Sequence, residues 1–370
     1  MNRSDPSQYE GHVVLFHGPG KPLTWQATQW SCPKVGEVLV QITHSAICRS
    51  DLHTHCGHRA VTTPTVLGHE IIGRVVALGA QAPEVDLRGH PIAVGDRVTW
   101  SIYAHCGRCP NCQAGWPQKC AKLFKYGHEP VAKDGQPSSG GMASYILLRP
   151  GTAILVLEPT LPDQYAVALN CAMATAAAVT RQGEVARRKD PVVVVMGGGY
   201  AGLSTVALCR AQGAGRVVVV ETQRSLHARA LSFGADAAFH PEDDSLKAWI
   251  SDHSSGRGAD QVMEMAGSSA AAQLGLDLLA VGGVLMLAGT VFPSPALALD
   301  PEAVVRRCQI IKGMHNYAPE DLVLATEFLA HDGAKLPWDS LHGGLFPLAE
   351  SQAAFELALQ LPGKRVILMP

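Results

Sequence analysis

The chain has 370 residues, more than one hydrophobic core usually serves, so two domains are expected. Its 47% hydrophobic, 17% charged and 6% aromatic residues are typical of a globular protein and exclude a disordered or fibrous one. With 30 basic and 32 acidic residues the net charge is -2, which gives no electrostatic reason to expect nucleic acid or an anionic membrane as a partner. A small-molecule partner is the better expectation.

The N-terminal stretch, residues 1–12, is polar and lacks the apolar core of a secretory signal. No uncharged apolar run reaches the roughly 18 residues that a membrane helix needs. We therefore expect a cytoplasmic protein that does not bind membranes. In that reducing compartment, closely spaced cysteines are more often metal ligands or redox groups than disulfides.

Short strand-like runs separated by turns fill the first part of the chain, for example residues 37–47 and 143–148. This alternation predicts an antiparallel, partly closed β-domain. Between the two runs lie the segments "SAICRSDLHTHCGH" at 45–58 and "GHEIIGRVVALG" at 68–79. Taken alone, their polar residues have ordinary explanations: Cys48 as a small buried residue, His69 as a core histidine and Glu70 as a solvated charge.

Four cysteines in the segment 106–120 follow the spacing C-x2-C-x2-C-x7-C. Zinc(II) in structural sites takes four soft ligands in a tetrahedron, and the glycines and prolines between the cysteines allow the tight turns that this requires. A redox pair, free cysteines and an iron–sulfur cluster are the alternatives, although the usual cluster spacing differs in its fourth position. We favour structural zinc, held by Cys106, Cys109, Cys112 and Cys120.

A dinucleotide-binding pattern begins at residues 191–196, an unbroken apolar run typical of a buried parallel strand. It leads into "GGGYAG", whose Gly197, Gly199 and Gly202 satisfy G-x-G-x-x-G, and a second buried strand ends at Glu221. Such glycines allow a tight turn and a close approach to a pyrophosphate, and the acid can bind the ribose hydroxyls. This favours NAD over NADP, a preference that Arg224 could soften.

Four further strand candidates start near residues 236, 261, 283 and 308, separated by helix-compatible segments such as 268–283. With the first two they make six. The second part of the chain is therefore predicted to be an α/β domain with a doubly wound parallel sheet of the Rossmann type.

The pattern G-H-E-x2-G-x5-G at 68–79, followed by "VGDRV" at 94–98, resembles the zinc-containing alcohol dehydrogenases of the medium-chain dehydrogenase/reductase family. The resemblance covers nearly the whole chain. It implies a GroES-like, partly closed β-barrel catalytic domain at 1–172, an NAD-binding Rossmann domain at 173–314 and a return to the catalytic domain at 315–370. It also implies an active site between the domains and a homodimer or homotetramer.

The resemblance further implies two zinc ions per chain, the four-cysteine segment holding the structural one. Cys48, His69 and a third residue downstream would hold the catalytic ion and leave one position open. Cys171, four residues before Thr175, matches the third ligand, although a cysteine at an alanine-rich helix start is commonly mere packing. Glu70 would be an additional or replacement ligand or would lie just behind the ligands.

Other family roles fall on residues beside these ligands. Asp51 matches the carboxylate that binds the zinc-bound histidine and fixes its tautomer. Ser50 and His53 match a proton relay from the alcohol to the surface, with an ordinary surface histidine as the alternative for His53. Arg49 matches a pyrophosphate contact, with an exposed arginine nearly as good an explanation. The cofactor-binding set is thus Gly197, Gly199, Gly202, Glu221, Arg224, Arg49 and Thr175.

These residues predict an NAD- and zinc-dependent alcohol dehydrogenase that oxidises an alcohol to an aldehyde or ketone by reversible hydride transfer. The alternative is a zinc-poor or inactive family member that acts as a cofactor-binding or structural protein.

The substrate stays open. Segments 125–129 and 313–329 resemble a branch of the family associated with phosphonate catabolism, which implies a phosphonate-bearing or similarly polar alcohol. A simple alcohol, a polyol or an aldehyde adduct is equally allowed. Donors to an anionic group could come from His128, His315, Asn316 and Tyr317.

Overall fold

The structure is a computed structural model that describes residues 8–131, 139–185 and 189–370. Residues 1–7, which carry most of the polar N-terminal stretch, lie outside the described residues. The chain divides into two compact units. The first unit comprises residues 1–171, 318–326 and 342–370, and the second unit comprises residues 172–317 and 327–341.

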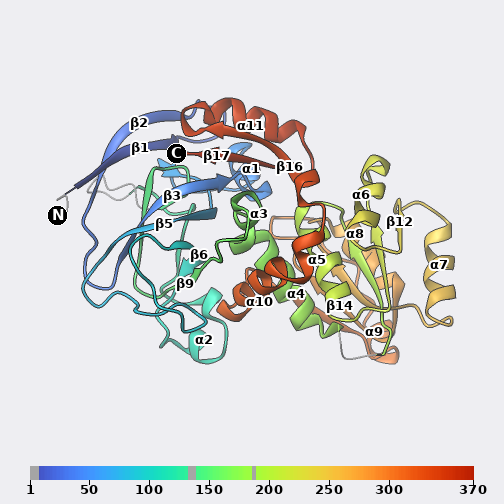
Figure 1. Cartoon of the computed structure of the whole chain (residues 1–370). Coiled ribbons are helices and arrows are strands. Elements are labelled where there is room, and N and C mark those ends of the chain that lie inside the picture. The colour runs from blue at the N-terminus through green and yellow to red at the C-terminus, as the bar shows by residue number, and fades with distance from the viewer. Residues whose placement is uncertain (1–7, 132–138, 186–188) are drawn as a thin grey trace. The chain divides into compact units, whose positions relative to one another are not determined.

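The first unit is built on a curled sheet in the order β16-β17-β3-β5-β6-β7, with β8 paired to β3 and β9 paired to β6 (Figure 1). A second sheet has the order β2-β1-β4. The strand pairs of the curled sheet are antiparallel except β16 with β17, which are parallel, so the predicted antiparallel β-domain is confirmed with one exception. The strands are β1 Gln8–Phe16, β2 Thr24–Ser31, β3 Val38–Ala46, β4 Thr65–Val66, β5 Glu70–Leu78, β6 Arg97–Ala104, β7 Phe124–Lys125, β8 Tyr145–Leu148, β9 Thr152–Val156, β16 His342–Pro347 and β17 Arg365–Met369.

The helices of the first unit are short, at most 10 residues long. α11 packs against β16 and β17, and its apolar face joins the core through the fully buried Phe355. The π-helical turn Leu169–Met173 contains the point in the chain, after Cys171, at which the first unit ends and the second begins. The helices are α1 Arg49–His55, α2 Pro110–Gln113, α3 Asp163–Ala166 and α11 Ser351–Gln360.

The second unit contains a six-stranded parallel sheet in the order β12-β11-β10-β13-β14-β15. The order reverses between β10 and β13, as in a dinucleotide-binding sheet, so the predicted doubly wound fold is confirmed. Its strands are β10 Val192–Met196, β11 Arg216–Val220, β12 Ala237–Phe239, β13 Ala259–Glu264, β14 Leu279–Leu287 and β15 Ile310–Gly313. Its helices are α4 Ala174–Gly183, α5 Tyr200–Ala211, α6 His227–Ser232, α7 Ser245–His253, α8 Ser269–Leu278 and α9 Pro301–Arg306.

Two local features of the second half differ from the sequence prediction. The helix-compatible segment 268–283 is helical only to Leu278, because Leu279 already pairs with Ala259 and starts β14. Residues 327–341, expected in the catalytic domain, belong to the second unit. There the fully buried Trp338 packs against Tyr200 and Phe233, and α10 Pro319–Ala330 crosses the division.

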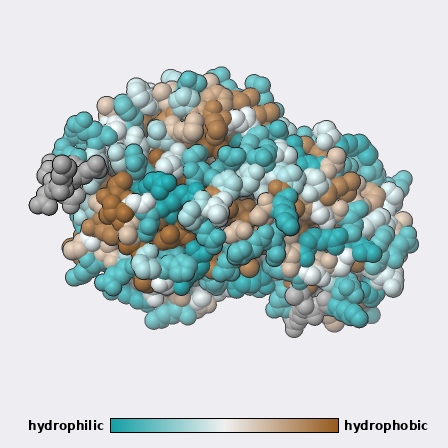
Figure 2. All heavy atoms as spheres, in the orientation of Figure 1, coloured by the Kyte–Doolittle hydropathy of each residue, from teal (hydrophilic) through white to brown (hydrophobic). Residues whose placement is uncertain are grey.

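Hydrophilic residues spread over the face of the molecule shown in Figure 2, and apolar residues gather there in separate smaller areas. Among the described residues, no helix has the length and apolar character needed to cross a membrane.

We expect that Gly202, in the first turn of α5, cannot be replaced by a residue with a side chain without disturbing the loop between β10 and α5. A Cβ on Gly202 would lie 1.9 Å from the carbonyl oxygen of Gly197, so Gly202→Ala must open the loop and should cost about 2 kcal/mol or more of stability. Thermal and urea unfolding measure this.

Gly199→Ala is the matched control. Gly199 has a φ of -74° and nothing within 4 Å of a built Cβ, so its substitution should change stability by less than about 1 kcal/mol. Equal losses for the two variants would contradict the loop geometry.

Candidate active site and metal centres

Three potential ligands from distant segments meet in the first unit. The Sγ atoms of Cys48 and Cys171 and a ring nitrogen of His69 lie within 4.8 Å of one another. Cys48 follows β3, His69 immediately precedes β5, and Cys171 lies in the π-helical turn. π-turns often occur at functional sites because they displace a residue from the regular helical register. Two soft sulfurs and an imidazole make a donor set suited to zinc, with a fourth tetrahedral position open.

Asp51 connects two of these ligands. Its Oδ2 accepts a hydrogen bond from the backbone N–H of Cys48 at 3.0 Å, which caps helix α1. Its Oδ1 accepts from the N–H of Gly68 at 3.3 Å and lies 3.2 Å from Nδ1 of His69. With Nδ1 facing the carboxylate, Nε2 of His69 is the atom free to bind a metal.

Ser50 lies beside that nitrogen, with its Oγ 3.1 Å from Nε2 of His69. His53 follows three residues later on α1, so both project on the same side of the helix. Its Nδ1 lies 3.3 Å from Nδ1 of His58. Burial, together with the charges of Arg49 and His58, lowers the pKa of His53. Arg49 itself is exposed.

Glu70 is engaged by an arginine that the sequence analysis missed. Arg365, the first residue of β17, donates to Oε2 of Glu70 at 2.5 Å and to Oε1 at 2.9 Å, and both side chains are buried. Its Nη2 also lies 3.7 Å from Sγ of Cys48. Both oxygens of Glu70 therefore face a cation, and the ligand cluster does not include this carboxylate. The sequence did offer a signal for Arg365, because it is a charged residue at the start of the apolar run "RVILM". A charge that is buried with such a strand needs a partner of opposite charge.

The ligand side chains interact strongly with one another. The hydrogen bond from Cys171 holds the pKa of Cys48 well below its usual range, and the same bond, together with burial, raises the pKa of Cys171. Burial alone would lower the pKa of His69, but Asp51 and Cys48 raise it to about 10. Burial raises the pKa of Glu70, and Arg365 opposes that shift. The cluster thus holds a thiolate stabilised by neighbouring donors, as a soft metal requires.

The four-cysteine segment forms a second cluster, with all four Sγ atoms within 4.8 Å of one another. Cys109 Sγ lies 3.5 Å from that of Cys112 and 3.9 Å from that of Cys120, close to the roughly 3.8 Å edge of a tetrahedron around one zinc. Sulfurs this close leave no room for a multi-iron cluster. All four cysteines are free rather than disulfide-bonded.

Backbone N–H groups point at the sulfurs of this second cluster. Cys120 Sγ accepts from the N–H of Cys106 at 3.2 Å and of Lys122 at 3.3 Å, and Cys109 Sγ accepts from Ala121 at 3.4 Å. Backbone hydrogen bonds, that from Ala121 first, lower the pKa of Cys109 to about 6. The loop is thus shaped to stabilise thiolate charge and to enclose one ion.

The glycine loop of the second unit has the expected local geometry. It lies between β10 and α5, and Gly199 precedes the first turn of α5. Glu221 follows β11, and its Oε2 accepts from the N–H of Gly198 at 2.7 Å. Arg224 is exposed and paired with Asp243, its nitrogens 2.5 and 3.1 Å from the two carboxylate oxygens. A 2′-phosphate would therefore compete with Asp243 for Arg224.

The remaining predicted residues are divided between the units. Thr175 is half-buried in α4 of the second unit, which also contains His315, Asn316 and Tyr317. His128 belongs to the first unit, with its ring centroid 5.1 Å from that of His69. Its Nδ1 donates to the carbonyl of Tyr126 at 2.9 Å, and burial with nearby cations lowers its pKa well below the usual value. The neutral ring offers Nε2 as an acceptor rather than a donor.

Two further basic side chains near the ligands were missed by the sequence analysis. Arg59 and Lys125 are half-buried, and the charges of Cys48 and Cys171 act on both. Arg59 lies in no motif, and Lys125 opens segment 125–129, to which the sequence analysis gave no role for Lys125, because a lone Arg or Lys usually indicates a solvated charge.

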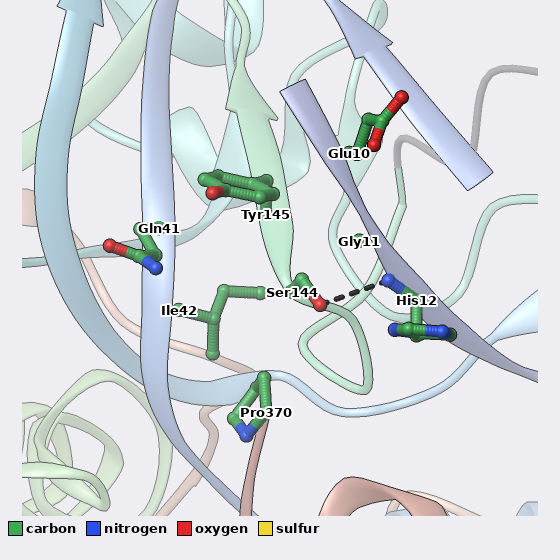
Figure 3. A pocket seen from close by; sticks show the side chains of 8 residues that line it. All are labelled: Glu10, Gly11, His12, Gln41, Ile42, Ser144, Tyr145 and Pro370. Carbon is green, nitrogen blue, oxygen red and sulfur yellow. Dashed lines mark hydrogen bonds between the residues drawn. The ribbon is translucent and has the colours of Figure 1, made fainter. Parts of the chain in front are cut away.

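A separate hollow of about 340 Å³ lies at the surface of the first unit, between β1, β3 and β8 (Figure 3). There the N–H of His12 donates to Oγ of Ser144 at 3.0 Å. None of the predicted site residues lines this hollow. Its lining consists of Glu10, Gly11, His12, Gln41, Ile42, Ser144, Tyr145 and Pro370.

Comparison with known proteins agrees with this fold and site. Residues 34–158 match the alcohol dehydrogenase GroES-like domain, and residues 201–331 match the zinc-binding dehydrogenase domain. The chain is 29% identical to a D-arabitol-phosphate dehydrogenase of Enterococcus avium, over 88% of this chain and 87% of that protein. It is 27% identical to a sorbitol dehydrogenase of Halalkalibacterium halodurans, over 84% of each chain.

Among solved structures, an alcohol dehydrogenase of Thermotoga maritima superposes with a TM-score of 0.89 at 28% identity, covering 98% of this chain and all of the other. Two domain matches that together span more than half of the chain, with a full-length structural match, identify the family. This chain belongs to the zinc-dependent alcohol dehydrogenases of the medium-chain dehydrogenase/reductase family. The resemblance inferred from the sequence motifs is thus confirmed.

The buried pair of Glu70 and Arg365 predicts a specific pattern of stability. Arg365→Met leaves a buried carboxylate without its cation and should cost about 3–5 kcal/mol, whereas the double variant Glu70→Leu/Arg365→Met should cost much less. Thermal unfolding of the single and double variants measures this. A double variant as unstable as Arg365→Met would show that the pairing does not govern stability here.

Proposed function

We propose that this protein is an NAD- and zinc-dependent alcohol dehydrogenase that reversibly oxidises an alcohol to an aldehyde or ketone. The observation that carries the proposal is the convergence of Cys48, His69 and Cys171, with the hydroxyl of Ser50 3.1 Å from the metal-binding nitrogen of His69. Such an open three-ligand set is typical of catalytic rather than structural zinc.

Within this proposal the bound groups supply the central chemistry: zinc lowers the pKa of the alcohol hydroxyl, and NAD accepts the hydride from the alcohol carbon. Ser50 accepts the hydroxyl proton and passes its own proton on in the same step, because its Oγ lies next to the nitrogen around which the alcohol would bind. His53, three residues further along α1, then carries the proton toward solvent. Asp51 keeps the His69 ring in the orientation that presents Nε2.

We assign Glu70 a supporting role in this proposal rather than that of a ligand. Arg365 occupies both of its oxygens and lies 3.7 Å from the sulfur of Cys48. The pair therefore sets the charge around a ligand thiolate without itself binding the metal. Arg365 joins the site residues in this role.

NAD is the proposed cofactor, with Gly197, Gly199 and Gly202 facing its pyrophosphate and Glu221 its adenosine ribose. Glu221 supports NAD over NADP because a carboxylate repels a 2′-phosphate. The pairing of Arg224 with Asp243 adds to this preference, because that guanidinium is already neutralised. Arg49 and Thr175 are proposed as further cofactor contacts.

We further propose that the enzyme works in the cytoplasm as a homodimer or homotetramer. Ten free cysteines suit a reducing compartment.

Metal analysis tests the two proposed zinc sites. We expect two zinc ions per chain, one for each ligand cluster. Cys171→Ser should remove one ion and abolish oxidation of alcohols with little change in thermal stability, because an open site is not needed for folding. Cys109→Ser should remove the other ion and lower thermal stability, because the closed cluster organises its loop. A zinc content that does not fall in Cys171→Ser would contradict the assignment of Cys171.

Ser50→Ala tests the proton relay. We expect kcat for alcohol oxidation to fall about 100-fold or more, with zinc content and thermal stability intact, because a positioned proton acceptor is lost. Ser50→Thr keeps the hydroxyl and should retain most of the activity. NADH production at 340 nm measures both variants, and an unchanged kcat in Ser50→Ala would remove Ser50 from the relay.

A further inference from the structure

A buried carboxylate that the proposed chemistry does not use ends a central strand of the parallel sheet. Glu264 is the last residue of β13, and its side chain is fully buried. In register it lies between Met196, the last residue of β10, and Leu287, the last residue of β14. These residues end three parallel strands at one edge of the sheet, where the strand order reverses and the glycine loop begins.

The two oxygens of Glu264 accept hydrogen bonds from two different loops. Oε1 accepts from the backbone N–H of Gly267 at 2.6 Å and from that of Ser268 at 3.4 Å. Oε2 accepts from the backbone N–H of Thr290 at 3.0 Å and from its hydroxyl at 2.8 Å. Gly267 and Ser268 follow β13, whereas Thr290 follows β14. One side chain therefore connects the loops that leave two neighbouring strands.

This double connection requires a carboxylate. Glutamine, the neutral side chain of the same length, has one acceptor oxygen and an NH2 group that cannot accept, so it could serve one loop but not both. Within the described ranges no cationic side chain forms an ion pair with Glu264, so hydrogen bonds rather than a cation stabilise the carboxylate. Hydrogen bonds to an ionised acceptor are roughly twice as strong as neutral ones, which makes the connection firm.

The two loops also touch each other, and one of them touches the glycine loop. A Cβ on Gly289 would lie 2.5 Å from the backbone nitrogen of Gly267. A Cβ on Gly197 would lie 3.1 Å from Cα of Ala266, so the backbones are in direct contact. Residues 266–268 are exposed, whereas the carboxylate that holds them is buried. An exposed surface beside the glycine loop thus takes its shape from a buried side chain.

We propose that Glu264 is a positioning residue of the cofactor site: it fixes the loops 265–268 and 288–290 as one side of the binding site for the nicotinamide nucleoside. This inference rests on the proposed use of NAD. A Rossmann sheet binds a dinucleotide across the point where its strand order reverses, with one mononucleotide on each half. Glu221, which follows β11, is proposed for the adenosine ribose, so the half that contains β13 and β14 remains for the nicotinamide nucleoside.

Hydride transfer gives such a fixed surface a function. The nicotinamide ring must be held at reacting distance from the alcohol carbon, and a misplacement of about 1 Å can lower the rate about 100-fold. Loops are ordinarily more mobile than the strands they connect. Two loops that share the buried carboxylate of Glu264 lose much of that freedom. Glu264 should therefore govern how the nicotinamide nucleoside binds, and much less how the adenosine half binds.

Calorimetric binding of NADH and of ADP to the zinc-loaded protein tests the role of Glu264. ADP carries the adenosine and both phosphates but lacks the nicotinamide nucleoside. In Glu264→Gln we expect the affinity for NADH to fall about tenfold or more, as the loss of a hydrogen bond to a charged group implies, and the affinity for ADP to change less than about threefold. An unchanged affinity for NADH, or an equal loss for both ligands, would overturn the inference.

Asp260→Asn is the matched control, because it changes a second buried carboxylate of the same strand. Asp260 lies near the opposite end of β13, accepts from the N–H of Val192 at 2.9 Å and pairs with Arg257 at 2.8 Å. Its substitution should lower thermal stability but leave the ratio of NADH affinity to ADP affinity unchanged. If the ratio falls as much in Asp260→Asn as in Glu264→Gln, general destabilisation explains the effect and the inference fails.

Thr290→Val is a milder variant that decides the question if Glu264→Gln does not fold. It removes the hydroxyl that donates to Oε2 and keeps the size of the side chain. We expect the ratio of NADH affinity to ADP affinity to fall about threefold or more in Thr290→Val and to be retained in Thr290→Ser, which keeps the hydroxyl. With Glu264→Gln unfolded, an unchanged ratio in Thr290→Val would overturn the inference.

Turnover separates this inference from the proposed reaction, because the binding measurements need none. If the wild type oxidises no alcohol but Glu264→Gln loses affinity for NADH and not for ADP, the inference stands and the proposed reaction fails. If alcohols are oxidised and the affinity ratio of Glu264→Gln equals that of the wild type, the reaction stands and the inference fails. In an active enzyme we expect Glu264→Gln to raise the KM for NAD and also to lower kcat about tenfold, since the ring is held less firmly.

Discussion

In the first unit, the geometry of two potential metal ligands depends on one buried carboxylate, that of Asp51. Asp51 receives the N–H of Cys48 on one oxygen, and its other oxygen receives the N–H of Gly68 and faces the ring of His69. The first contact is also the cap that starts α1, so the interaction that begins the helix is the one that fixes a ligand. Local folding and ligand geometry are therefore coupled. A displacement of Asp51 would affect the helix start and two ligand positions together.

The two cysteine clusters stabilise thiolate charge in different ways. In the segment 106–120, backbone N–H groups point at the sulfurs, and four ligands close the site. Around Cys48 the surroundings are more deeply buried, and the hydrogen bond from Cys171 takes that role first, followed by the charge of the Arg365 guanidinium. Four protein ligands fill the coordination sphere of a zinc ion and so stabilise the loop that carries them. Three protein ligands leave one coordination position for a substrate. The difference in surroundings thus parallels the proposed difference in role.

Much of the fold could be predicted because its signals are local. The six strands of the second unit are short apolar runs, and the glycine spacing of 197–202 reflects a turn whose contacts lie within a few residues. The start of β14 was missed, since only pairing of Leu279 with Ala259, outside its own segment, makes it a strand. Residues 327–341 were assigned to the wrong part of the chain for a similar reason: Trp338 packs on Phe233, about a hundred positions away in sequence.

In the candidate site, too, residues with a local sequence signal were predicted and residues held by long-range contacts were not. The four cysteines of segment 106–120 stand in a spacing that indicates ligands, and the family resemblance assigned Cys48 and His69. All six residues lie in the two clusters of potential ligands. Arg365 gave only a weak signal, a charge at the start of an apolar run, and its partner Glu70 could not be named because it is 295 residues distant in the chain. Arg59 also lacks a motif, and Lys125, the first residue of segment 125–129, would by itself be taken for a solvated charge.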